Sequence, residues 1–195
     1  MSRTIPRKKI TLACKLALEE AEETYRQWTG GVSMRAAPES FVQTILAKKL
    51  HSEFGISVLL EASVGDIRKV TSGEQLVDPA PKGGRIDIVA YYKSTEPRFL
   101  IELKKLTSSY SLKGDTERIR ELMKCNSSIQ NGLLVAYTMA AKESTVLDRL
   151  SAQAELLHIK QVQTLEARPA KSRVGKNLVL AGAIYRVDRE VENDT

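Results

Sequence analysis

The sequence has 195 residues, which is enough for one globular domain but too few for two of ordinary size. Hydrophobic residues make up 42% and charged residues 28%, a balance that excludes a disordered or low-complexity chain. Lys and Arg total 30 against 24 Asp and Glu, and this net charge of +6 favours anionic partners. Aromatic residues are only 5%, so contacts with nucleic acid are expected to use phosphates rather than stacked bases.

The cysteine content and the apolar runs indicate the compartment. Cys14 and Cys125 are too few for a disulfide framework, and neither has a His or Cys at zinc-ligand spacing. No apolar run approaches the ~20 residues that a bilayer span requires. The basic N-terminus leads into a stretch interrupted by Lys15, unlike a signal peptide. We therefore expect a cytoplasmic protein with reduced thiols and no membrane segment.

Two helices are predicted at the start of the chain. Residues 10–28 place apolar side chains on one narrow stripe, which suits packing on the domain or on a second copy of the chain. We favour packing on the domain, with a homodimer as the alternative. The second helix should begin at Pro38, whose missing N–H is tolerated in a first turn, and should run to about Phe54. Gly55 follows as a stop signal.

The middle of the chain is predicted to contain four strands, at 56–62, 85–92, 98–106 and 132–138. The first of them is apolar enough to be a buried strand. The long connection at 63–84 has room for a small hairpin, and the second and third strands should pair across a turn. A helix capped by Asp115 is expected between the third and fourth strands, ending near Cys125.

The C-terminal part is predicted to add a helix at 143–157, a weaker strand near 158–166 and a stronger strand at 177–187. The loop between these two strands contains four cationic residues, Arg168, Lys171, Arg173 and Lys176. Such a loop could follow a phosphate backbone, although basic loops are often simply solvated. The element order is therefore a helix, then α-β-β-β-α-β, then α-β-β, which is a mixed α/β layer structure.

Two acidic residues in neighbouring strands form the most informative pattern. Alternation along the strands places Glu102 and Lys104 on one face. If Tyr92 pairs with Pro97 across a four-residue turn, Asp87 lies opposite Glu102. Two adjacent carboxylates repel each other, so we expect a cation between them, and Mg²⁺ held by carboxylates, water and phosphate fits. Lys104 could then orient or help to deprotonate a metal-bound water, which makes a hydrolytic site for phosphodiesters.

This arrangement resembles the PD-(D/E)xK nuclease superfamily, which has the restriction-endonuclease-like fold. The resemblance covers residues 38–138 and implies an αβββαβ core with a mixed sheet flanked by helices. Residues 1–31 would be an N-terminal helical extension and residues 139–195 a C-terminal α-β-β extension, all within a single nuclease-like domain. Ile86 stands where the family often has proline, a departure that is common among its members.

The resemblance also implies roles for individual residues. Asp87, Glu102 and the main-chain carbonyl of Leu103 would hold Mg²⁺, for which Mn²⁺ could substitute. Lys104 would assist the nucleophilic water. Glu39 matches a helix glutamate that reaches the metal through water in many members, although the helix dipole also favours a glutamate in a first turn without any catalytic purpose.

The same pattern has less specific readings. An E-x-K triplet by itself also occurs as a solvated ion pair on an exposed strand. Arg85 could contact the scissile phosphate or be a surface charge at a strand end, and for Lys113, Arg118 and Arg120 a solvated helix face is favoured. The sequence thus predicts a Mg²⁺-dependent endodeoxyribonuclease acting on double-stranded DNA. The alternative is a catalytically inactive nucleic-acid-binding or assembly protein that keeps the nuclease fold.

Overall fold

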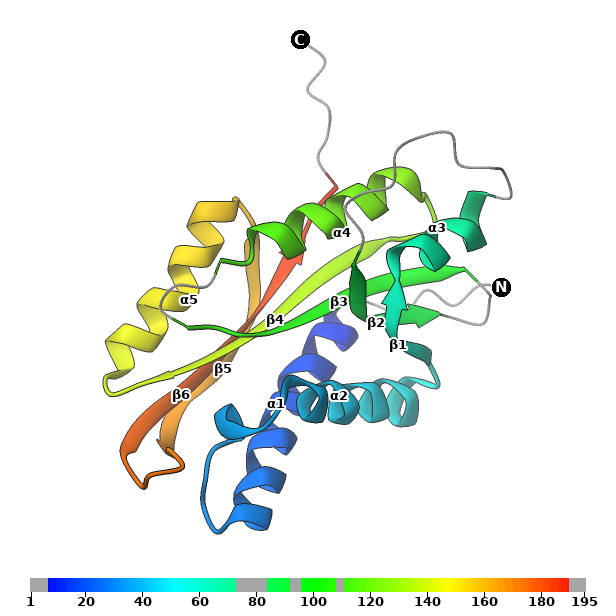
Figure 1. Cartoon of the computed structure of the whole chain (residues 1–195). Coiled ribbons are helices and arrows are strands. Elements are labelled where there is room, and N and C mark those ends of the chain that lie inside the picture. Colours follow the sequence, from blue (N-terminus) through cyan, green and yellow to red (C-terminus); the bar gives the residue numbers. More distant parts are fainter. Residues whose placement is uncertain (1–6, 73–83, 92–95, 108–110, 190–195) are drawn as a thin grey trace.

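The computed structural model describes residues 7–72, 84–91, 96–107 and 111–189. Its strands are β1 (Ser57–Ser63), β2 (Arg85–Tyr91), β3 (Pro97–Lys105), β4 (Asn131–Ala140), β5 (Lys160–Lys171) and β6 (Asn177–Val187). They form one six-stranded sheet in the order β1-β2-β3-β4-β6-β5 (Figure 1). The β3–β4 pair is parallel and the other neighbours are antiparallel, so the sheet is mixed, as the sequence predicted.

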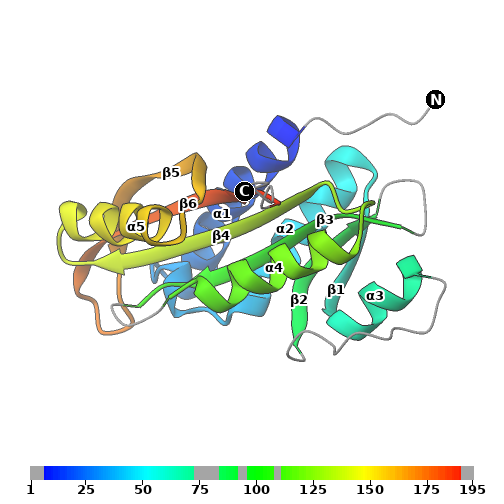
Figure 2. The ribbon, with the colours of Figure 1, turned by 90° about the horizontal axis from the view of Figure 1, so that it is seen from above.

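The helices cover both faces of this sheet. They are α1 (Arg7–Thr29), the short 3-10 helix η1 (Met34–Ala36), α2 (Glu39–Phe54), α3 (Val64–Ser72), α4 (Lys113–Cys125) and α5 (Glu143–Leu157). In Figure 1, α1 and α2 lie below the sheet, whereas α4 and α5 lie above it, and Figure 2 shows α4 and α5 along the near face. Within the described ranges, no helix combines the length and the apolar character needed to cross a membrane.

Each face of the sheet has its own apolar layer. Side chains such as Leu18 and Leu46 from α1 and α2 pack with Ile101 of β3 on one face. Ile119 of α4 and Val146 of α5 belong to the cluster on the other face. The side of α1 that carries Leu18 is buried against the sheet, so the expected packing of the first helix on the domain is confirmed.

The central strands β3 and β4 are joined by α4, the crossover that a parallel pair requires. Most residues of both strands are buried, which explains the predominantly apolar sequence of β4 and the apolar centre of β3. At Gly132 in β4 the side chains of α4 lie close to the strand backbone. A Cβ atom at this position would overlap the Ile119 side chain, so the glycine permits the contact.

One prediction for the region before β2 was wrong. The first strand was expected to be buried, but most of β1 is exposed because it is the edge strand and has only β2 as a neighbour. The start of the 63–84 connection, which had room for a hairpin, forms α3, while residues 73–83 lie outside the described residues. Ser63 explains this helix, since its Oγ accepts a hydrogen bond from the Asp66 N–H at 3.0 Å, as a capping residue does.

Other predicted boundaries also shift. Pro38 directly precedes α2 instead of opening it, and α4 begins at Lys113, two residues before Asp115. Gly55 ends α2 in the left-handed conformation, as expected. The predicted basic loop is partly strand, because β5 extends to Lys171 and the turn at 172–176 separates it from β6. Arg168 and Lys171 are therefore strand residues, while Arg173 and Lys176 lie in the turn.

We predict that Gly132→Ala lowers the free energy of unfolding by about 1–3 kcal/mol, because the added methyl group overlaps a packed side chain. Gly114→Ala is the matched control, since a Cβ atom at Gly114 meets nothing within 4 Å. The control should leave stability unchanged or raise it by up to about 1 kcal/mol through helix propensity. Urea denaturation measures both changes, and equal losses would contradict the assigned close contact.

Candidate active site

The site begins where β2 separates from β3. In the central part of the hairpin Ile88 lies opposite Ile101, the register that the sequence predicted. The turn end differs, because a bulge shifts the pairing so that Tyr91 lies opposite Pro97, while Tyr92 lies outside the described residues. The ladder between the described residues of β2 and β3 ends at Ile88 and Ile101, one residue before the two acidic positions.

Where β2 no longer pairs with β3, two carboxylates accept the hydrogen bonds of the β3 amides. The Leu103 N–H donates to Asp87 Oδ2 at 2.6 Å, and the Lys105 N–H donates to Glu39 Oε1 at 2.7 Å. Amides two residues apart in a strand point to the same side, so Asp87 and Glu39 follow each other along one edge. This gives both carboxylates a structural task, because each satisfies a main-chain amide that β2 leaves without a ladder partner.

Glu102 lies on the face of the sheet that α4 covers, where its side chain is 1% exposed. Arg118 Nη1 donates to Glu102 Oε1 at 2.7 Å and to Asp115 Oδ1 at 3.2 Å. Asp87 also lies within hydrogen-bonding reach of the Glu102 carboxyl, so the structure brings the two acidic groups together. The α4 residues and the strand residues thus form one compact charged cluster.

Burial raises the pKa of Glu102 to about 9, and the neighbouring Asp87 and Asp115 carboxylates add to this rise. The charge of Lys104 opposes it, which places the ammonium group within electrostatic range of Glu102 on the predicted face. At neutral pH Glu102 therefore carries a proton that it can share with Asp87.

Arg118 corrects one expectation. It was expected on a solvated helix face, but it is half-buried and pairs with Glu102 and Asp115. Gly84 lies against it, since a Cβ atom there would be 3.1 Å from Arg118 Nε. The sequence did contain a signal for the buried acid beside it, because Asp115, Ile119 and Leu122 share one face of α4.

Gln43 was also missed by the sequence analysis. It is buried in α2, and its side-chain amide donates to the Asp87 carbonyl at 2.5 Å and to Glu61 Oε1 at 3.1 Å. Glu61 has a positive φ of 53°, which marks a local break in β1 opposite Asp87. Gln43 therefore holds the β2 backbone and the Glu61 side chain of β1 at the point where the site is built, and it acts as a positioning residue.

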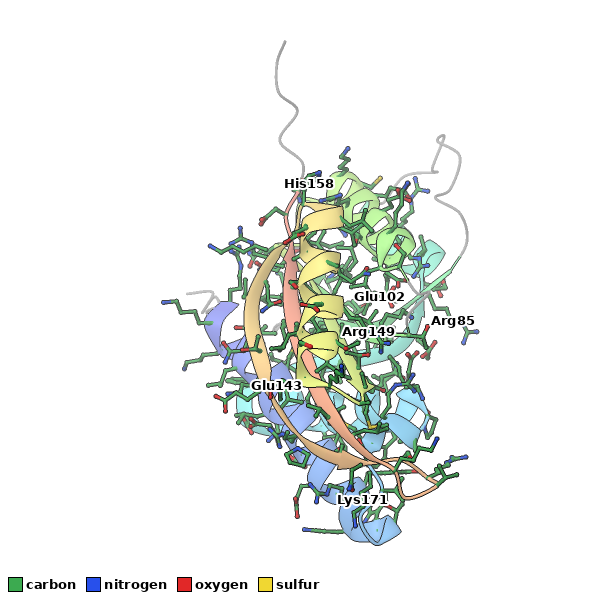
Figure 3. All side chains as sticks on the ribbon, turned by 90° about the vertical axis from the view of Figure 1, so that its left-hand side faces the viewer. Arg85, Glu102, Glu143, Arg149, His158 and Lys171 are labelled. Carbon is green, nitrogen blue, oxygen red and sulfur yellow. The ribbon has the colours of Figure 1, made fainter. Side chains whose placement is uncertain are left out.

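The expected nucleic-acid contacts are dispersed. Arg85 is exposed at the start of β2, and its carbonyl accepts a hydrogen bond from Arg118 at 3.4 Å. Arg168 instead forms an ion pair with Glu19 of α1 at 3.4 Å. Figure 3 shows Lys171 at the lower end of the β5–β6 hairpin, well below the level of Glu102. Arg85, Arg168 and Lys171 therefore do not form one continuous cationic surface.

Arg173 and Lys176 differ in their surroundings although both lie in the β5–β6 turn. Arg173 reaches back to η1, where it donates to the Ala36 carbonyl at 3.1 Å. Lys176 is exposed, and its main-chain N–H is held by Ser172 Oγ at 3.1 Å within the turn. Of the four cations expected in one loop, only Arg173 is therefore held beside the start of α2.

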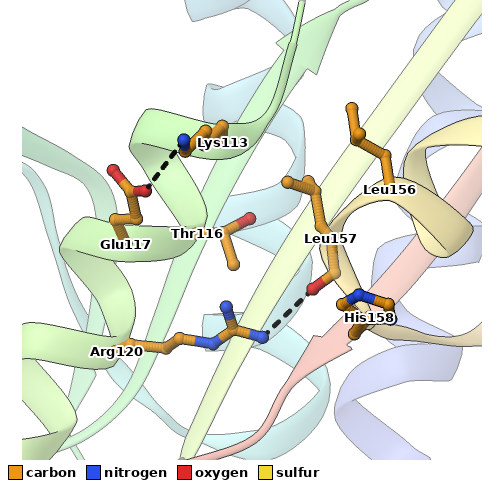
Figure 4. A pocket seen from close by; sticks show the side chains of 7 residues that line it. All are labelled: Lys113, Thr116, Glu117, Arg120, Leu156, Leu157 and His158. Atoms are coloured by element: carbon orange, nitrogen blue, oxygen red, sulfur yellow. Dashed lines mark hydrogen bonds and ion pairs between the residues drawn. The ribbon is translucent and has the colours of Figure 1, made fainter.

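A separate pocket of about 240 Å³ lies between α4 and α5 (Figure 4). Its polar side chains already have partners: Lys113 lies 3.8 Å from Glu117, and Arg120 donates to the Leu157 carbonyl at 3.2 Å. His158 at its rim has a left-handed backbone that ends α5. Arg118 is not among the residues that line this pocket, so the pocket is distinct from the acidic site.

The donor set of the acidic site fits a hard divalent cation. No three Asp, Glu, His or Cys side chains within the described ranges converge as a metal cluster. Mg²⁺, however, is commonly held by one or two carboxylates together with water and phosphate. Asp87 and Glu102 supply two carboxyl groups, and the Leu103 carbonyl faces the Asp87 side because the N–H and C=O of one strand residue point to the same neighbour.

We predict that Glu102 makes stability fall as pH rises. The folded protein holds a proton on Glu102 up to about pH 9, whereas the unfolded chain loses it near the ordinary pKa of 4.5. The folded state thus binds more protons between these values, and this group lowers the free energy of unfolding by up to about 1.4 kcal/mol per pH unit there. Glu102→Gln should remove this slope, because the neutral amide can donate to Asp87 and accept from Arg118.

Urea unfolding at several pH values tests this prediction. Glu117→Gln is the control, since Glu117 is an exposed residue of the same helix and should leave the slope unchanged. An unchanged slope in Glu102→Gln would show that Glu102 is ionised in the folded protein.

Comparisons of the chain with protein-family models, curated proteins and solved structures found no significant match. The residues that indicate a function are the Asp87–Glu102 pair, the neighbouring Lys104 and the Arg118–Asp115 pair of α4.

Proposed function

We propose that the protein is a Mg²⁺-dependent nuclease of the PD-(D/E)xK type, which hydrolyses DNA phosphodiester bonds with an activated water. One observation carries the proposal: Asp87 and Glu102 meet at the point where β2 leaves β3, and Lys104 lies on the same strand face as Glu102. The net charge of +6 is consistent with a polyanionic substrate. The mixed sheet, with helices on both faces, provides the arrangement of elements that such a fold requires.

In this proposal the chain's own groups have distinct roles. Asp87, Glu102 and the Leu103 carbonyl hold Mg²⁺, which when bound supplies Lewis acidity and lowers the pKa of water. Lys104 orients the attacking water, since its ammonium group is near Glu102. Glu39 lies along the same strand edge, where it holds the Lys105 amide and can accept a hydrogen bond from that water. Gln43 keeps the Asp87 backbone in place.

A specific observation favours the alternative of a non-catalytic nucleic-acid-binding protein. Arg118 already contacts both Glu102 and Asp115, so the site has a cation of its own. A metal ion would have to displace the Glu102 proton and compete with this guanidinium. Cleavage of DNA in the presence of Mn²⁺ or Mg²⁺ separates the two functions.

We predict that Asp87→Asn and Glu102→Gln each reduce metal-dependent DNA cleavage at least about 100-fold. Asparagine is preferable to alanine at position 87, because its carbonyl oxygen can still accept the Leu103 N–H and keep the strand edge intact. Glu117→Gln is the surface control and should retain full activity. Wild-type cleavage by either site variant would contradict the assignment, and circular dichroism verifies that both remain folded.

Lys104→Ala should lower cleavage about 100-fold or more while Mn²⁺ binding, measured by calorimetry, is retained. The reason is that Lys104 acts on the water and does not ligate the metal. Lys113→Ala, which removes an exposed cation from α4, is the matched control. If Lys104→Ala abolished Mn²⁺ binding, the lysine would instead be needed to assemble the carboxylate pair.

A further inference from the structure

Four cationic side chains from distant parts of the chain gather near the C-terminal ends of β3 and β4. They are Arg35 of η1, Lys105 at the end of β3, Arg149 of α5 and Arg173 of the β5–β6 turn, and we call them the cationic cluster. The turn residue is exposed, and the other three are half-buried. The cluster therefore joins both layers of the fold at one end of the sheet.

Hydrogen bonds to carbonyl groups hold three of these side chains in place. Lys105 Nζ donates to Ala37 at 2.8 Å, and Arg173 Nη2 donates to the adjacent carbonyl of Ala36 at 3.1 Å. Arg149 Nη1 donates to the Met139 carbonyl, near the end of β4, at 3.3 Å. Neutral carbonyl groups position the cations but leave their charges uncompensated.

The members of the cluster lie within electrostatic range of one another. Burial lowers the pKa of Lys105, and the charges of Arg35 and Arg173 lower it further. Burial also lowers the pKa of Arg35, and Arg149 adds to that effect. Such mutual repulsion is unfavourable unless an anion offsets it.

The chain itself supplies little negative charge to the cluster. Glu39 is the carboxylate that acts on both Arg35 and Lys105. Burial raises the pKa of the nearby Tyr137 hydroxyl, so this group stays neutral. In the described part of the chain, no salt bridge includes a member of the cluster. Among the described residues, Arg35 and Lys105 thus share a single carboxylate.

The location indicates which anion would bind. Lys105 directly follows Lys104, and Glu39 and Asp87 lie along the same edge of β3, so the cluster is adjacent to the acidic site. The planar guanidinium groups of three arginines match the oxygens of a phosphate and can form paired hydrogen bonds with it. A nucleic-acid strand is the ligand that presents a second phosphate next to the one being cleaved.

We propose that the cationic cluster binds a backbone phosphate of a nucleic-acid strand beside the acidic site. The position of the scissile phosphate rests on the proposed nuclease function, whereas strand binding can be measured without cleavage. The cluster takes over the task first expected of the C-terminal basic loop, and Arg173 is the residue common to both.

The test compares two triple variants that lose the same charge. Arg35→Gln, Arg149→Gln and Arg173→Gln remove three cluster cations, while Lys9→Gln, Lys48→Gln and Lys160→Gln remove three exposed lysines elsewhere. Fluorescence anisotropy with a labelled DNA duplex, in Ca²⁺ and over a range of salt concentrations, gives the Kd and its salt dependence. The cluster variant should bind about tenfold or more weakly, with a salt slope smaller by about 3, and the control should stay near the wild type.

Further measurements keep the outcomes distinct. Arg173→Gln alone changes an exposed residue, so it should stay folded and reduce the slope by about 1. Equal effects of the two triple variants, or no DNA binding by the wild type, would overturn the proposal. Thermal stabilisation by inorganic phosphate without DNA binding would identify a small-anion site and would overturn it as well.

The failure of this proposal can be told apart from failure of the proposed function. Binding that depends on the cluster in a protein that cleaves nothing would support the phosphate surface and reject the nuclease. Metal-dependent cleavage with unchanged binding by the cluster variant would do the reverse. Calorimetry with Mn²⁺ should give the same affinity for the cluster variant and the wild type, because no cluster residue belongs to the acidic pair.

Discussion

The separation of β2 from β3 after Ile88 is the constraint on which the rest of the site depends. It removes the ladder partners of two buried-strand amides, those of Leu103 and Lys105, and an unsatisfied buried amide costs about 1–3 kcal/mol. Asp87 and Glu39 offset that cost. The carboxylates at these two positions therefore have a structural role that is independent of any metal or substrate. The same groups can also take part in catalysis.

On the α4 face the same separation sets the protonation of Glu102. Glu102 lies among the packed residues of β3, so its carboxyl is buried. Asp87, on β2, lies within hydrogen-bonding reach of this carboxyl at the point where β2 leaves β3. Burial favours the neutral form, and the charge of Lys104 limits that preference. A divalent cation at this position would replace a proton, which couples metal binding to pH.

The sequence predicted those features that depend on local periodicity. The hairpin register at Ile88 and Ile101 follows from strand alternation, and the α4 crossover follows from two apolar strands around a helical pattern. The exposure of β1 was not predictable in this way, because strand order, not apolarity, decides which strand is at the edge. The role of Arg118 was missed for a similar reason, since its partner Glu102 lies in another element and only tertiary packing joins them.

Lys104 and Lys105 are adjacent in β3 and extend in different directions, one towards the acidic pair and the other towards the cationic cluster. Lys104 acts on Glu102 on the α4 side, whereas the Lys105 side chain reaches the start of α2, where the cationic cluster gathers. An acidic pair alone repels a phosphodiester, and a cationic surface alone binds it without chemistry. Alternation along β3 places Lys104, beside the acidic pair, and Lys105, in the cationic cluster, at adjacent positions. A polyanion attracted by the cluster is thereby brought to the edge where Asp87 and Glu39 hold the strand open.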